Sequence, residues 1–371
     1  MFTLLLVLLG IHALIHLMGF AKAFGYAEIP ALTQAISRPM GLLWLLASVL
    51  LLAVTIGIFL HRADWWILGL PALLLSQALI FSAWKDARFG SLANLVLALA
   101  VLVAWSQSAF FKQTQSVLNQ LQPSAAPTQK QVTEQDLQGQ PEVIQKWLRR
   151  TGAVGPSWQD SLSLSQTGRM RTSPEGAWLK FQAKQYFNAL APGFVWQAQV
   201  QMFPGVSLLG RDQWFQNHGQ MLISAWGLIP VVNARGAEID QGTLLRYLGE
   251  MLWFPSSALR PSVQWRELSS ESAEATLTVG AQTVKAVMHF GPKGDFESML
   301  ALRYYARKTG ATLEKWQITA NPHSLKTFSG IHIPSRYTVS WLLKEGDFDW
   351  LELEIGDLAY NSARPFSGPL K

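Results

Sequence analysis

Four long apolar runs fill the first 111 residues of this 371-residue chain, and they constrain its fold more than any other feature. A helix needs about 20 mostly apolar residues to cross about 30 Å of hydrocarbon. Each run comes close to that length: Phe2–Ala23, Met40–Leu60, Trp65–Trp84 and Ser91–Phe110. We therefore expect residues 1–111 to form a four-helix transmembrane domain that anchors the rest of the chain on one side of a membrane.

Basic residues between these runs predict which side that is. Lys and Arg near the ends of membrane helices favour the cytoplasm. One side carries Lys22, Arg38, Lys85 and Arg88, and the other carries only Arg62 and Lys112. The bias predicts a multi-pass protein of the bacterial inner membrane whose C-terminal domain is periplasmic or extracellular. A cleaved signal peptide is the rival interpretation of the first run, but the basic start of such a peptide is missing.

Composition excludes several classes of function. The net charge of +6 is spread among Trp and Glu residues and forms no basic run, so no nucleic-acid partner is expected. With no Cys, the chain has no disulfide, thiolate metal site or cysteine nucleophile. Neither a glycine-rich phosphate loop nor a dinucleotide fingerprint is visible, and we assign no cofactor and no catalytic residue.

The rest of the chain divides into a polar linker, residues 112–139, and an α+β domain, residues 140–371. The linker is rich in Gln, Ser, Thr and Pro, which is typical of a tether. From Gly168 onward apolar residues alternate between turn signals, which predicts antiparallel hairpins and a curved antiparallel sheet or half-barrel. The expected strands include 206–212, 220–232, 263–267, 274–279, 283–290, 298–305, 313–318, 336–343 and 348–360.

Two helices interrupt this pattern. Pro141–Arg150 has apolar residues three to four apart. Gln241–Phe254 does so too, with Asp240 as the expected N-cap and Pro255 as its end. This second helix is apolar enough to be covered on most sides, and we expect the curved sheet to wrap around it.

The second helix and its surroundings also carry a resemblance. The residues are Ile239-Asp240, Leu245-Arg246-Tyr247-Leu248, Glu250 and Trp253-Phe254-Pro255, with Pro192-Gly193-Phe194-Val195-Trp196 before them and Trp341 and Tyr360-Asn361 after. Over Gln140 to Asn361 the chain resembles an uncharacterised bacterial envelope family, a domain of unknown function behind membrane helices. The resemblance implies no reaction, and it implies a half-barrel similar in shape to that of lipoprotein-carrier proteins.

Two histidines stand out in the first apolar run. His12 and His16 lie four residues apart, so both project from one side of the helix at mid-span. An ionisable group inside a membrane is a functional hypothesis by default. The pair could ligate haem or a metal, relay a proton or contact a quinone, and the alternative is that each hydrogen-bonds to a neighbouring helix.

In the exterior domain the candidate ligand-binding residues are Trp196, Trp226, Arg246, Glu250, Trp253 and Trp341. Aromatic side chains usually fill cores, but they also line grooves that bind apolar ligands. Arg246 and Glu250 lie four residues apart and form either an exposed ion pair or a buried polar latch at the mouth of a cavity. A third cluster, at 212–240, contains Asp212, His218 and Asp240, and turns explain it more simply than catalysis.

These features predict a protein that binds an apolar or amphipathic ligand, such as a lipid or a lipoprotein segment, as carrier or sensor. It is not primarily an enzyme. The first alternative is a hydrolase or lyase of envelope glycan or lipid that uses Asp240 and Glu250. The second is a scaffold whose helices dock a membrane-protein partner.

Overall fold

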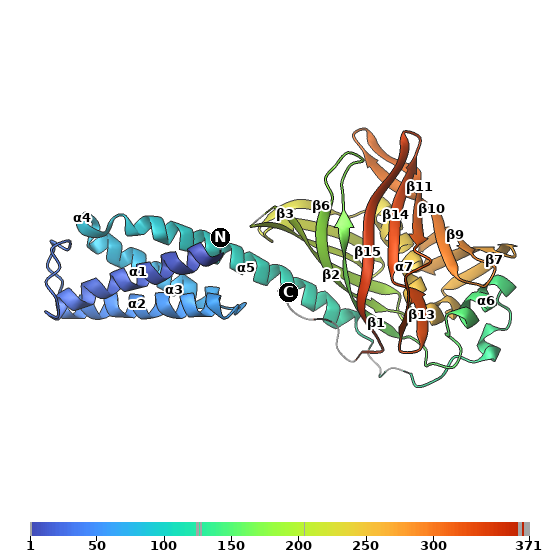
Figure 1. The fold of residues 1–371 in the computed structure, drawn as a ribbon, viewed down its shortest axis with the longest axis horizontal. Helices are drawn as coiled ribbons and strands as arrows, with labels where there is room; N and C mark the ends of the chain where they lie inside the picture. The colour runs from blue at the N-terminus through green and yellow to red at the C-terminus, as the bar shows by residue number, and fades with distance from the viewer. Residues whose placement is uncertain (1, 124–125, 127, 204, 363–365, 367–371) are drawn as a thin grey trace. The chain divides into compact units, whose positions relative to one another are not determined.

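The computed structural model describes residues 2–123, 126, 128–203, 205–362 and 366. Contacts divide the chain into two compact units. The first contains residues up to Phe110 together with Trp226–Leu228, and the second contains Phe111–Ala225 and the chain from Ile229 onward. Figure 1 shows the helices of the first unit and the large sheet of the second.

The first unit is helical. Among the described residues three helices are long and apolar enough to cross a membrane: α1 (Phe2–Ala23), α2 (Arg38–Phe59) and α5 (Gly90–Leu121). Two shorter helices, α3 (Trp66–Ser82) and α4 (Trp84–Ala87), complete it. Ser37 caps α2, and Asp86 in α4 accepts hydrogen bonds from Thr33 and Gln34 in the α1–α2 connection.

The expectation of four membrane-spanning helices is therefore wrong by one. The third run was expected to continue from Trp65 to Trp84, but α3 has only 17 residues because the backbone of Ala83 leaves the helical region (φ −117°, ψ 33°). At about 1.5 Å per residue such a helix covers about 26 Å, which is less than the hydrocarbon thickness of about 30 Å. Trp84 belongs instead to the separate helix α4.

The second unit is built on one antiparallel sheet. Among the described residues thirteen strands lie in the order β6-β5-β4-β3-β2-β1-β15-β14-β11-β10-β9-β8-β7. The sheet curves without closing, because β6 and β7 are its edges, so the predicted half-barrel is confirmed. The strands are β1 (Ser161–Met170), β2 (Leu179–Asn188), β3 (Gly193–Phe203), β4 (Val206–Phe215), β5 (His218–Ala225), β6 (Ile229–Ala234), β7 (Val263–Ser269), β8 (Ser272–Val279), β9 (Gln282–Phe290), β10 (Phe296–Arg307), β11 (Gly310–Ala320), β14 (Arg336–Leu343) and β15 (Gly346–Tyr360).

The helix α7 (Ala237–Glu250) lies on the concave face of this sheet, behind β14 in Figure 1. It follows the edge strand β6 and, through the 3₁₀ turns η2 (Met251–Trp253) and η3 (Pro255–Leu259), leads to the opposite edge strand β7. The chain thus crosses the concave face from one edge to the other. Leu244, Leu245 and Leu248 are buried against β4, β5, β9 and β10, so the sheet wraps the helix as expected.

The start of α7 differs from the sequence prediction. Gly236, with a positive φ of 110°, precedes the first turn, and Asp240 lies inside the helix. The Asp240 carboxylate accepts a hydrogen bond from the backbone N–H of Gly219 at 2.6 Å, at the start of β5. Asp240 therefore fastens a strand to the helix and is not the N-cap.

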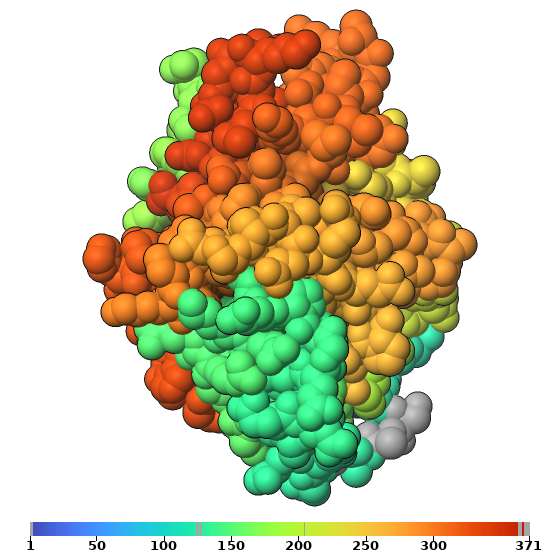
Figure 2. Space-filling view, turned by 90° about the vertical axis from the view of Figure 1, so that its right-hand side faces the viewer, coloured from blue at the N-terminus to red at the C-terminus, as the bar shows by residue number. Residues whose placement is uncertain are grey.

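A helical segment covers one end of the sheet. The helix α6 (Glu142–Arg150) packs Trp147 against Trp265 and Phe290, and Figure 2 shows residues 130–160 lying against β7–β9. The expected polar linker, 112–139, contains structure of its own. α5 continues through it to Leu121, and the 3₁₀ turn η1 (Glu134–Leu137) buries Leu137 in the core.

Two further features were not predicted. The expected strand 220–232 is two strands, β5 and β6, separated by a turn at Trp226-Gly227 where both residues have positive φ. A small separate hairpin, β12 (Leu325–Phe328) and β13 (Ile331–Pro334), lies between β11 and β14.

Candidate functional site

A cavity of about 180 Å³ lies between the concave face of the sheet and α7. Its wall is mostly apolar and includes Met170, Phe181, Trp253, Trp316, Ile318 and Val339. The polar part of the wall consists of three arginines, Arg211, Arg246 and Arg303, with the acids Asp212 and Glu250 and the amide of Gln166. An apolar cavity with a few convergent polar groups is the usual form of a ligand site.

Arg246 is the centre of a buried ion network. One turn of α7 brings its Nε within 2.8 Å of a Glu250 oxygen, and its Nη1 lies 2.7 Å from an oxygen of Asp212 on β4. The three side chains are only 16%, 13% and 7% exposed, for Arg246, Asp212 and Glu250 respectively. The pair is therefore not an exposed surface ion pair, and the buried network is the alternative that the structure supports.

Hydrogen bonds extend this network along the sheet. Gln185 on β2 donates to the second oxygen of Glu250 at 2.7 Å. Gln166 on β1 donates to Gln185 at 3.3 Å and accepts from the indole N–H of Trp196 at 2.8 Å. The Trp196 ring in turn lies under the Arg246 guanidinium, 4.8 Å from its Cζ. Burial is the largest influence on Glu250 and raises its pKa, while the positive charge of Arg246 opposes that shift.

Arg303 on β10 is the third arginine of the cavity wall, and it differs from Arg246. Its guanidinium carbon lies 4.7 Å from the Trp316 ring and 5.9 Å from the Trp341 ring. In the described part of the chain no side-chain hydrogen bond or ion pair to Arg303 is formed. Burial lowers its pKa to about 10, which leaves it charged at neutral pH.

The cavity contains four of the six predicted ligand-binding residues: Trp196, Arg246, Glu250 and Trp253. Trp341 lies 5.9 Å from the Arg303 guanidinium carbon and Trp226 lies in the β5–β6 turn, and neither is among the residues that line the cavity. Sequence reasoning missed Arg303 and Trp316. A signal for Arg303 existed in the sequence, because Met299, Ala301 and Arg303 stand at alternate positions of a strand, and alternate residues face the same side of a sheet.

The cluster at 212–240 separates into different structural roles. His218 is 78% exposed, and its Nδ1 lies 3.5 Å from an oxygen of Asp240, which is tied to Gly219. Asn233 accepts a hydrogen bond from Gln220 across β5 and β6. Asp240 and Glu250, the two acids of the hydrolase alternative, are thus each engaged by different partners, and the members of the cluster lie on strands and on α7 and not in turns alone.

His12 and His16 lie on α1 inside the first unit. The Nε2 of His12 is 3.1 Å from both Ser76 Oγ and Asn94 Oδ1, and Asn94 continues the chain of hydrogen bonds to Gln77. His16 donates through Nδ1 to the carbonyl of His12 at 2.9 Å, and its buried Nε2 finds no hydrogen-bond partner among the described residues. No cluster of three metal-ligating residues occurs in the described ranges. A cofactor at this pair stays a prediction.

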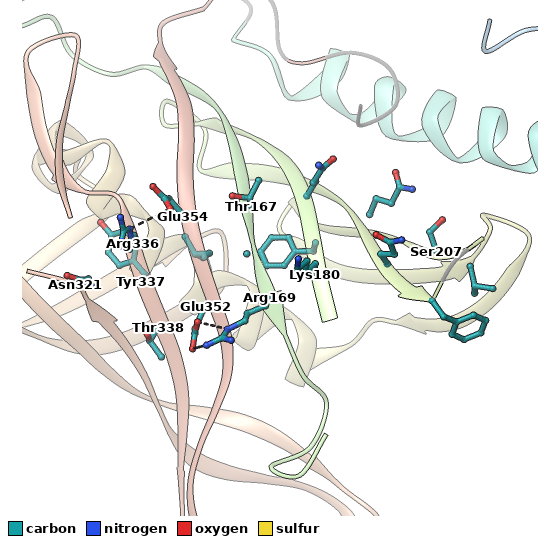
Figure 3. A pocket seen from close by; sticks show the side chains of 18 of the residues that line it. Thr167, Arg169, Lys180, Ser207, Asn321, Arg336, Tyr337, Thr338, Glu352 and Glu354 are labelled. Carbon is teal, nitrogen blue, oxygen red and sulfur yellow. Dashed lines mark hydrogen bonds and ion pairs between the residues drawn. The ribbon is translucent and has the colours of Figure 1, made fainter. Parts of the chain in front are cut away.

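A second and larger hollow, about 1030 Å³, lies on the outer face of the sheet across β14, β15, β1 and β2 (Figure 3). Its wall mixes polar and apolar side chains. The charged side chains form pairs between neighbouring strands, Arg169 with Glu352 at 2.7 Å and Arg336 with Glu354 at 3.5 Å. This groove is open to water and its ion pairs are half-exposed, so we place the candidate ligand site in the inner cavity.

Comparisons with known proteins found a similar crystal structure and a matching family. A crystal structure of a putative outer membrane lipoprotein-sorting protein domain from Vibrio parahaemolyticus is similar over 60% of this chain and 92% of its own, with 12% identity and a TM-score of 0.31. No curated protein matches the chain. Residues 130–353, which hold the cavity and both of its flanking edges, match the model of a family of unknown function. The chain therefore belongs to that family, DUF6544.

Proposed function

We propose that this protein is a membrane-anchored carrier or sensor whose half-barrel binds an apolar or amphipathic ligand. The apolar helices hold it in the bacterial inner membrane, and the half-barrel stands on the periplasmic or extracellular side. The inner cavity is the single observation that supports this proposal, since its mostly apolar wall lies beside a network of buried charges.

The volume of the cavity limits the size of the ligand that it can bind. Ligand pockets usually measure about 300–1,000 Å³. At about 180 Å³ this cavity accepts a head group with the first part of a hydrocarbon chain, or a small apolar molecule. A longer chain requires the open sheet to widen, and the free edges β6 and β7 leave room for such a movement.

The test is photolabelling of the full chain in phosphatidylcholine nanodiscs with long-chain alkyl probes that carry a diazirine. Mass spectrometry of the digested protein locates the label. We expect labelled peptides from β11 and β14, which contain Trp316 and Val339, in addition to peptides from the apolar helices. Label in the helices serves as the internal reference, because it reports bilayer contact alone.

A cavity-filling variant makes the test specific. Gly210 lines the cavity, and a Cβ there would lie 3.6 Å from its nearest atom, in the Trp196 ring, which is an ordinary contact distance. Gly210→Leu therefore places a larger side chain in the cavity and fills it. It should abolish label in β11 and β14 and leave the helices labelled. The matched control is Gln182→Leu on the outer face, which should change neither. Label confined to the helices in every variant would overturn the proposal.

The orientation of the half-barrel is tested separately. Alkaline phosphatase fused to the C-terminus is active only outside the cytoplasm, and a green fluorescent protein fusion reports the opposite side. We expect an active phosphatase fusion. A fluorescent fusion with inactive phosphatase would place the domain in the cytosol and contradict the charge-bias argument.

A further inference from the structure

Resting on the proposed function, we propose that the ligand is an acyl-chain lipid with a negatively charged head group, and that Arg303 binds that group. A carboxylate and a phosphate share the required chemistry, and the experiment below separates them. The inference assigns to Arg303 a role that differs from that of the other arginines in the wall.

The first argument is the charge of the wall. It carries three arginines against two carboxylates, and Arg246 alone engages both carboxylates, at 2.7 and 2.8 Å. Asp212 and Glu250 are therefore already paired with Arg246, although Oδ1 of Asp212 keeps no hydrogen-bond partner among the described residues, and within those residues Arg303 has no carboxylate in ion-pair distance. The Arg303 side chain is only partly exposed, and withdrawing a charge from water is costly unless it is paired. An anion entering the cavity would supply the missing partner.

The second argument is the way the guanidinium is held. Trp316 and Trp341 lie 4.7 and 5.9 Å from its Cζ, and a cation over an indole face is stabilised by the ring. On α7 the guanidinium lies against Gly242. A Cβ at this position would approach Arg303 Nε to 2.9 Å, so the missing side chain makes space for the guanidinium. The head of Arg303 is thus positioned by fixed neighbours that use none of its hydrogen-bond donors.

The third argument is what lies beside that head. Arg303 shares the cavity wall with apolar side chains from β11 and β14, among them Ile318 and Val339. A planar guanidinium offers paired N–H donors that match a carboxylate or a phosphate. An anionic head at Arg303 would leave its hydrocarbon chain against the apolar wall, which is the arrangement an amphiphile requires.

The experiment compares four diazirine probes on the full chain in phosphatidylcholine nanodiscs. Palmitic acid and phosphatidic acid carry a carboxylate and a phosphate, and hexadecanol and diacylglycerol are their neutral counterparts. A charge-assisted hydrogen bond is worth about 1.5–3 kcal/mol, so label in β11 and β14 should be at least about tenfold stronger for an anionic probe than for its neutral partner. The stronger of the two anionic probes identifies the head group.

Three variants locate the effect. Arg303→Met should remove the preference for the anionic probe, and Arg303→Lys should keep part of it because the charge stays. The matched control is Arg307→Met on the same strand, since Arg307 pairs with Glu314 and Glu345 away from the cavity. Thermal unfolding of each variant shows whether it is folded, and the lysine variant still tests the proposal if the methionine variant is not.

The outcomes distinguish the two proposals. Equal cavity label from anionic and neutral probes, unchanged in Arg303→Met and Arg303→Lys, would overturn the role of Arg303 and leave the ligand-binding function intact. No cavity label from any of the four probes would overturn the function itself. A preference for anionic probes that survives both Arg303 variants would assign the head group to another residue.

Discussion

Removing Arg246 should destabilise the half-barrel strongly. Arg246→Met keeps most of the side-chain volume but leaves Asp212 and Glu250, 13% and 7% exposed, without their cation. Breaking a buried ion pair by removing one partner costs about 3–5 kcal/mol, because the remaining charge is buried and uncompensated. For a domain of this size about 1 kcal/mol lowers the unfolding midpoint by about 2–4 °C. The expected drop is therefore about 6–20 °C.

The same structure offers a matched control. Arg169 and Glu352 on the outer face also lie 2.7 Å apart, but their side chains are 51% and 38% exposed. Exposed pairs contribute about 0–1 kcal/mol, so Arg169→Met should lower the midpoint by no more than about 4 °C. The distance is the same in both pairs, and only burial differs.

Thermal unfolding of the full chain in detergent, followed by tryptophan fluorescence, measures both variants. The loss in Arg246→Met should shrink as the pH falls, since burial raises the pKa of Glu250 and protonation neutralises its stranded carboxylate. Equal midpoints for Arg246→Met and Arg169→Met at neutral pH would refute the reasoning, because they would show that the network is solvated in spite of its burial.

Three further predictions follow from single sites. Burial raises the pKa of Glu250, so just above about pH 4.5 the folded protein still holds a proton that the unfolded chain has lost. Stability should fall as the pH rises through that range toward the raised pKa, and Glu250→Gln should remove this part of the pH dependence of the unfolding midpoint. Gly168→Ala should destabilise by more than about 2 kcal/mol because its Cβ would lie 2.1 Å from a backbone oxygen, whereas Gly210→Ala should be tolerated; equal midpoints would contradict this. His12→Leu should cost about 1–2 kcal/mol by removing the hydrogen bonds that join His12 to Ser76 and Asn94, and a haem absorption band lost in this variant would instead support a bound cofactor.

Much of the architecture was predictable because each feature has a local sequence signal. Alternating apolar residues identified most strands, and Arg336–Leu343 matches β14 from end to end. The apolar helix between the strands identified the element that the sheet wraps. The half-barrel then follows from many sequential strands and one central helix that needs cover.

The errors have physical causes that single-residue patterns do not carry. Asp is a residue type that favours the N-cap position, but the N-cap is Gly236, about one turn earlier. The Asp240 carboxylate is therefore free to accept a hydrogen bond from β5. The third apolar run has the right composition for a crossing, but the backbone turn at Ala83 cuts it short. The ion network of the site could not be predicted from local sequence. Asp212 lies 34 residues from Arg246 along the chain and pairs with it only in the folded domain.

The pairing of β1 with β15 has a consequence for how the domain is made. The first and the last strand are neighbours in the middle of the sheet, with β2 to β6 on one side and β7 to β14 on the other. Until β15 has been synthesised, the two halves share no strand that joins them. Contacts between distant parts of a chain form slowly. The two parts of the sheet therefore wait for β15 before they join, and a truncation that removes β15 should prevent assembly far more than the loss of the edge strand β6 or β7 would.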